Sequence, residues 1–67
     1  MYFKRLYDLR TDKDLTQQQV ADFLSCHRQV YGRYETGFRE IPVSMLIKLA
    51  KHYKVSVDYI LGLSDEK

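Results

Sequence analysis

The stretch that decides the fold runs from Leu15 to Gly37 and reads LTQQQVADFLSCHRQVYGRYETG. Thr16 can accept a hydrogen bond at a helix start, and Gln19, three residues later, completes a T-x-x-Q capping box. Apolar residues then recur at helical spacing on one side of the segment, at Val20, Ala21 and Leu24. The spacing therefore predicts a helix that is capped at Thr16 and runs to about residue 24.

A second helix is predicted directly after the first. Ser25 and Cys26 interrupt the apolar pattern, and His27 is the next plausible cap. The inner side of this helix is marked by Val30, Tyr31 and Tyr34. Gly37 suits the position after its end because glycine adopts positive φ without steric cost. We therefore expect two short helices joined by a tight turn.

The same periodicity extends outward in both directions. Phe3, Leu6 and Leu9 predict a helix over about residues 2–12. After a loop from Phe38 to Ile41, and with Pro42 near its start, another helix carries Leu46, Leu49, Ala50 and Tyr53. A last helix is expected to start at a Ser56 cap, carry Val57, Ile60 and Leu61, and close at Gly62. No segment alternates as a strand should, so the sequence predicts an all-α fold of five short helices.

Length and composition predict one domain over residues 1–67. The single cysteine, Cys26, excludes an internal disulfide and a cysteine-based zinc site, and it favours a reducing cytoplasm. The charged N-terminus does not resemble a secretory signal, and no apolar run approaches the roughly 20 residues that span a bilayer. The net charge of +2 is too small to indicate nucleic acid by itself. We expect a cytoplasmic protein without a membrane partner.

The quoted stretch and IKLAKHYKVSVDYILGLSD, which begins at Ile47, together resemble the Cro/phage-repressor class of helix-turn-helix domains, also called the XRE family. The resemblance covers about residues 6–64. It implies a compact five-helix, lambda repressor-like bundle, with the helix-turn-helix motif at about 16–35. It also implies a sequence-specific DNA-binding transcriptional regulator, most simply a repressor, whose third helix (about 27–35) enters the major groove.

Base-reading candidates follow from the face of the third helix opposite its apolar side. That face holds Arg28, Gln29, Gly32 and Arg33. Arginine pairs with guanine O6 and N7, glutamine pairs with adenine N6 and N7, and Gly32 would admit close approach of the groove floor. An ordinary solvated surface is the alternative, and the resemblance favours base contact.

The resemblance also implies a set of phosphate contacts. Gln17 matches a phosphate-binding glutamine at a positive helix end. Arg39 and the backbone of Phe38 fall in the loop that touches the sugar-phosphate chain, and His27 could contact a phosphate as well as cap its helix. A helix-forming Gln17 and a merely solvated Arg39 are the alternatives.

Other residues are assigned structural roles by the resemblance. Arg10 and Glu35 would form a partly buried ion pair. Asp14, Ser25 and Lys54 stand where such domains carry glycine or asparagine in left-handed turns. Tyr31 is bulkier than the usual aliphatic residue, so its hydroxyl is expected to reach solvent or a polar partner.

No enzyme is predicted, because Cys26 and His27 are adjacent and do not face each other. His52 is expected on the outer side of the fourth helix, and no metal, cofactor or small-molecule ligand is indicated.

The expected partner is double-stranded DNA with a palindromic operator, whose half-sites lie roughly 34–36 Å apart. A homodimer, weak or DNA-dependent, would use Tyr59, Leu61 and Leu63. The alternative is a protein-interaction module such as a toxin-neutralising antitoxin, which would usually carry an extension for the toxin.

Overall fold

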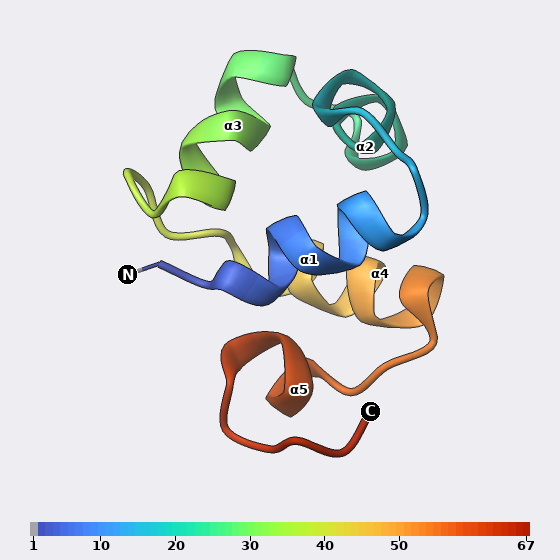
Figure 1. Ribbon diagram of the computed structural model, residues 1–67. Coiled ribbons are helices and arrows are strands. Elements are labelled where there is room, and N and C mark those ends of the chain that lie inside the picture. Colours follow the sequence, from blue (N-terminus) through green and yellow to red (C-terminus); the bar gives the residue numbers. More distant parts are fainter. Residues whose placement is uncertain (1) are drawn as a thin grey trace.

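The helices of the chain follow one another through tight connections. The computed structural model describes residues 2–67, and its helices are α1 (Lys4–Asp12), α2 (Gln17–Leu24), α3 (Arg28–Thr36), α4 (Val43–Tyr53) and α5 (Val57–Leu61). Figure 1 shows α2 and α3 at one end, α5 at the other, and α1 and α4 between them. The predicted all-α fold of five helices is confirmed. No helix among these residues is long and apolar enough to cross a membrane.

Local capping chemistry sets most helix ends. The Thr16 hydroxyl accepts from the Gln19 N–H at 3.1 Å, and the Gln19 side chain accepts from the Thr16 N–H at 2.8 Å, so the predicted capping box is present. Ser56 caps α5 in the same way, through the Tyr59 N–H at 3.0 Å. His27 occupies the N-cap position of α3, but its side chain accepts no capping hydrogen bond. The first helix begins at Lys4 rather than at residue 2.

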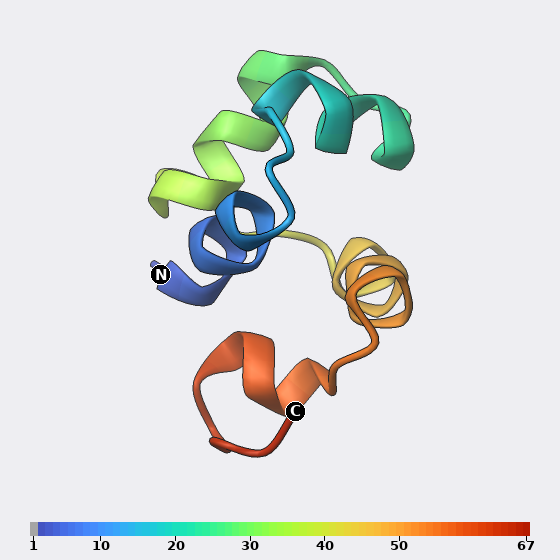
Figure 2. The same ribbon diagram turned by 45° about the vertical axis from the view of Figure 1, so that its right-hand side comes forward.

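The core collects the predicted apolar stripes. Its buried side chains are Leu6, Leu9, Val20, Ala21, Leu24, Tyr31, Ile41, Leu46, Leu49, Ala50, Tyr53 and Ile60. Ile41 comes from the loop before α4 and was not marked as core by helical spacing. The view in Figure 2 shows α1 lying beneath the pair formed by α2 and α3, and α1 packs against α3 and α5.

Left-handed backbone occurs at the three expected residues other than glycine: Asp14 (φ 56°), Ser25 (φ 59°) and Lys54 (φ 58°). Gly37 and Gly62 end α3 and α5 with φ of 84° and 79°. The turns that separate the helices thus need conformations that side chains adopt only at a steric cost.

The expectation for Tyr31 is met in part, because its hydroxyl does not reach solvent but lies beside a polar group, the Glu35 carboxylate. The Tyr31 side chain is fully buried, and its hydroxyl forms no hydrogen bond with any described residue. Two causes raise the pKa of Tyr31: first its burial, and then the negative charge of the nearby Glu35 carboxylate. The ring fills the centre of the core, and its polar end is enclosed because α3 packs tightly against α1 and α2.

The C-terminal segment is held against α1 by Arg5, a role that helical spacing did not reveal. The Arg5 guanidinium donates to the carbonyl oxygen of Tyr59 at 2.8 Å and to that of Ser64 at 2.5 Å. It also lies 4.1 Å from the centroid of the Tyr59 ring and pairs with Asp65. These contacts join the first helix to the last.

Candidate nucleic-acid interface

The outward face of α3 and the start of α2 line an open surface hollow of about 580 Å³. All four predicted base-reading residues line it: Arg28, Gln29, Gly32 and Arg33. Gln17, Thr36 and Phe38 complete the lining. We call these seven residues the reading face. Thr36 was missed by the sequence analysis, although it stands four residues after Gly32 and therefore shares the same face of α3.

The arginines of this region carry uncompensated positive charge. Arg28, Arg33 and Arg39 form no ion pair within residues 2–67, where the paired arginines are Arg5 and Arg10. The Arg33 guanidinium lies 5.9 Å from the centroid of the exposed Phe38 ring. A cationic surface of this kind favours binding of a polyanion such as DNA, because its arginines can neutralise backbone phosphates.

Arg39 and His27 lie outside the reading face. Arg39 lines a second, smaller hollow of about 200 Å³ on the other side of Arg33, together with Val30 and Tyr34. Its backbone N–H donates to the Arg33 carbonyl at 3.1 Å, which fixes the loop after α3. His27 is exposed at the start of α3 and lines neither hollow.

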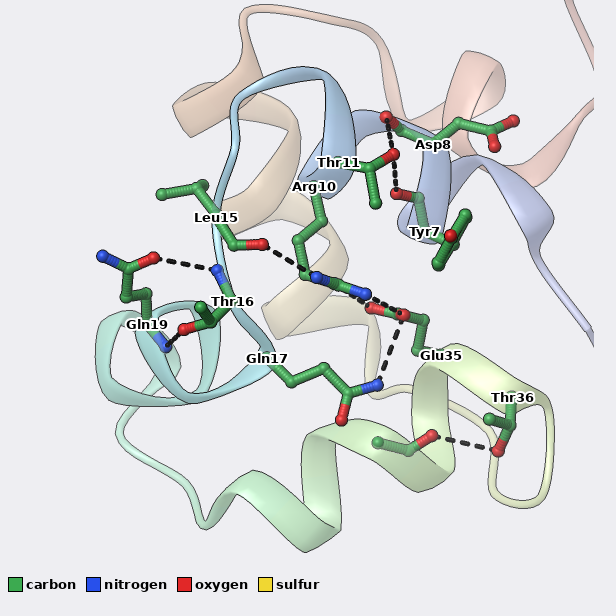
Figure 3. A network of polar contacts seen from close by, with 11 residues as sticks. Tyr7, Asp8, Arg10, Thr11, Leu15, Thr16, Gln17, Gln19, Glu35 and Thr36 are labelled. Atoms are coloured by element: carbon green, nitrogen blue, oxygen red, sulfur yellow. Dashed lines mark hydrogen bonds and ion pairs between the residues drawn. The ribbon is translucent and has the colours of Figure 1, made fainter.

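Gln17 is more constrained than a surface glutamine. Its side chain is half-buried, and Nε2 donates to Glu35 Oε1 at 3.3 Å (Figure 3). Its side-chain amide oxygen, Oε1, lies next to Gly32, and a Cβ added to Gly32 would be 3.3 Å from that oxygen. Gly32 thus has a role that the sequence did not reveal: it leaves room for the Gln17 amide between α2 and α3.

The Arg10–Glu35 ion pair is buried beneath this glutamine, as expected. Arg10 Nε and Nη2 donate to Glu35 Oε2 and Oε1 at 2.8 and 2.9 Å, and Nη1 donates to the Leu15 carbonyl at 2.8 Å. The side chains of Arg10 and Glu35 are 13% and 4% exposed. Burial alone would raise the pKa of Glu35, but hydrogen bonds from Arg10 and Gln17, with the nearby Tyr31 hydroxyl, lower it. Glu35 is therefore ionised at neutral pH.

Side chains suited to catalysis or metal binding are scattered. No group of three or more His, Cys, Asp or Glu residues among the described residues could hold a metal ion. Burial raises the pKa of the Cys26 thiol, which disfavours the nucleophilic thiolate. His52 is exposed on α4, as expected, and its ring centroid lies 4.5 Å from that of Phe23.

Comparison with protein families places this geometry among known domains. A family model described as Helix-turn-helix matches residues 6–60. The chain is 44% identical over 66 residues to the uncharacterised HTH-type transcriptional regulator YobD of Bacillus subtilis, covering 98% of this chain and 59% of that protein. It is 31% identical over 65 residues to the cryptic phage CTXphi transcriptional repressor RstR of Vibrio cholerae, covering 97% and 59%. It therefore spans about three fifths of the length of these curated relatives.

Two solved structures share the fold. A transcriptional regulator from Listeria innocua superposes with a TM-score of 0.88 at 24% identity, covering 100% of this chain and 63% of that one. The restriction-modification controller protein C.AhdI from Aeromonas hydrophila gives a TM-score of 0.73 at 30% identity, covering 85% and 83%. The first likeness concerns the fold alone.

Proposed function

Because the chain belongs to the XRE-type helix-turn-helix family, whose members here are transcriptional regulators, we propose that it is a sequence-specific DNA-binding regulator that inserts α3 into the major groove. The observation that carries this proposal is the reading face. Two arginines without carboxylate partners and a glutamine line one hollow on the outward side of α3. These are the side chains that read base edges.

The residues divide into two roles. Arg28, Gln29 and Arg33 contact bases. Gly32 has no side chain, so the centre of α3 can approach the floor of the groove closely. Phosphates are contacted by Gln17, His27, Arg39 and the backbone of Phe38. The positive end of the α2 dipole reinforces the Gln17 contact. Phosphate contacts position the protein, whereas base contacts specify the site.

Repression by a homodimer on a palindromic operator is the form of regulation that we propose. One module reads few base pairs, so two copies one helical turn apart, roughly 34–36 Å, supply the specificity. Repression is supported by the named repressor among the relatives. Leu63 is 75% exposed beside the half-buried Tyr59 and Leu61, which makes this C-terminal patch the candidate contact. A regulator of bacterial DNA acts in the cytoplasm.

Selection of bound duplexes from a random DNA pool, followed by titration at two salt concentrations, tests the function. The wild-type chain should recover a palindrome. Arg28→Ala and Arg33→Ala should each relax preference at one position of the half-site, at a cost of about 1–3 kcal/mol. Arg39→Ala should weaken all sequences alike and reduce the salt slope by about 1. Lys51→Ala, an exposed change on α4, is the matched control and should leave binding unchanged.

Binding that is weak, strongly salt-dependent and blind to sequence would contradict the proposal, because only phosphate contacts would then operate. In that case a protein partner such as a toxin would become the ligand to seek.

A further inference from the structure

A glutamine of α2 links the buried ion pair to the reading face. Glu35 Oε1 accepts from both Gln17 Nε2 at 3.3 Å and Arg10 Nη2 at 2.9 Å, while Oε2 accepts from Arg10 Nε at 2.8 Å. An ionised carboxylate has only acceptors, so the end of the Gln17 amide that faces it must be the amino group. The buried carboxylate thereby sets the orientation of the amide.

The opposite end of that amide is an acceptor with a set direction. Figure 3 shows Gln17 Oε1 pointing away from Glu35 toward α3. A Cβ added to Gly32 would lie 3.3 Å from this oxygen. Gln17 also lines the same hollow as Arg28 and Arg33. The guanidinium groups can only donate, so Gln17 Oε1 adds the opposite polarity to the reading face.

We propose that Glu35 is a positioning residue for DNA recognition: through Gln17 it holds a hydrogen-bond acceptor above Gly32, directed at the exocyclic amino group of an adenine or a cytosine. This inference rests on the proposed function. In the major groove the amino groups are adenine N6 and cytosine N4, whereas guanine and thymine present acceptors at the corresponding positions. Phosphate oxygens also accept, so Oε1 cannot bind them, and the remaining N–H of Gln17 is left for a phosphate.

Four variants of the full chain separate this role from a structural one. Gln17→Met keeps the length of the side chain and removes the amide. Glu35→Gln keeps the size of the side chain but offers an amino group of its own, which allows the Gln17 amide to turn round. Gln18→Met is the matched control, because Gln18 is exposed and its side chain hydrogen-bonds, among residues 2–67, only to Asp22. Lys51→Gly, on the exposed side of α4, controls for a loss of stability.

Selection from a random DNA pool, followed by affinity measurements on the selected site and its single-base changes, provides the readout. Gln17→Met and Glu35→Gln should lose the preference for an amino-bearing base at the same half-site position, by about tenfold. Gln18→Met and Lys51→Gly should keep the wild-type pattern. If Glu35→Gln does not fold, Glu35→Asp takes its place, because it keeps a carboxylate for Arg10 but is one methylene shorter, which withdraws the acceptor from Gln17 Nε2.

Uniform weakening on all sequences by Gln17→Met would overturn this inference and leave Gln17 as a phosphate contact. So would an unchanged preference in both Gln17→Met and Glu35→Gln. In either case the wild-type chain still selects a site, and the proposed function stands. A wild-type chain that selects no sequence would overturn the proposed function and this inference together.

Discussion

At the scale of single residues, the end of α4 carries backbone strain that a glycine would relieve. Lys54 follows Tyr53 with φ 58° and ψ 45°, a left-handed conformation in which a Cβ is crowded. Lys54→Gly should raise the free energy of unfolding by up to about 1 kcal/mol, since glycine's greater freedom in the unfolded chain offsets part of the relief. For a domain of this size that corresponds to a rise in Tm of roughly 4–8 °C.

Lys51→Gly is the matched control for that change. It makes the same replacement one turn earlier, at an exposed helical position of α4, and should lower the free energy of unfolding by about 1 kcal/mol. Thermal melting of both variants decides the matter. A Tm for Lys54→Gly at or below that of the wild type would show that the left-handed turn is not strained.

A buried tyrosine makes the fold sensitive to alkali. Burial, and then the nearby Glu35 carboxylate, raise the pKa of Tyr53 to about 12 from the ordinary 10.0. Between these values the unfolded chain releases a proton that the folded chain retains. Stability is therefore unaffected below pH 10 and falls as the pH rises above it, by up to about 1.4 kcal/mol per pH unit for this group.

Tyr53→Phe should reduce that alkaline loss, leaving only the share due to Tyr31. The Tyr53 hydroxyl is buried and forms no hydrogen bond with a described residue, so its removal should also stabilise the fold by about 1 kcal/mol at pH 7. Urea titrations at pH 7 and pH 11 measure both effects. Tyr7→Phe, at an exposed position, serves as the control and should match the wild type. An unchanged alkaline loss in Tyr53→Phe would contradict the assignment.

At the scale of elements, the packing of α2 on α3 depends on the space above Gly32. Gly32→Ala should raise the free energy of unfolding by up to about 1 kcal/mol through helix propensity. The new methyl group would, however, lie 3.3 Å from Gln17 Oε1, and this crowding offsets part of the gain. In a Gln17→Ala background that crowding disappears. We therefore expect Gly32→Ala to stabilise the Gln17→Ala protein more than the wild type, by at least about 0.5 kcal/mol. Urea denaturation of the four proteins measures the coupling, and additivity would exclude the contact.

At the scale of the whole molecule, Arg5 ties the two ends of the chain together. Its guanidinium donates to two backbone carbonyls, those of Tyr59 and Ser64, and stacks over the Tyr59 ring. Arg5→Ala should lower the free energy of unfolding by about 2 kcal/mol, because charged hydrogen bonds to partly buried carbonyls are lost. Hydrogen exchange should accelerate in α5 and the segment after it more than in α2 and α3.

Asp65→Ala provides the comparison for Arg5. The Asp65 side chain is 97% exposed, so its ion pair with Arg5 is screened by water and its removal should leave the Tm nearly unchanged. An equal loss in the two variants would mean that the carboxylate, rather than the carbonyls, holds the C-terminal segment.

The sequence by itself determined the five helices, the Thr16 capping box and the residues that share the outward side of α3, whereas the left-handed turns at Asp14, Ser25 and Lys54 were expected from the family resemblance. The first three depend on neighbours within about one helical turn, which periodicity and capping rules describe. The buried Arg10–Glu35 pair joins helices that are distant in the sequence, and it was accessible only through the family resemblance.

Only the tertiary structure decided the contacts between residues far apart in the chain. The bond from Gln17 to Glu35 spans 18 positions, and those from Arg5 to the C-terminal segment span 54 to 60. The burial of the Tyr31 hydroxyl and the room that Gly32 leaves for Gln17 depend in the same way on how α1, α2 and α3 pack. Such contacts follow from the directions of side chains in three dimensions, and local spacing carries no information about those directions.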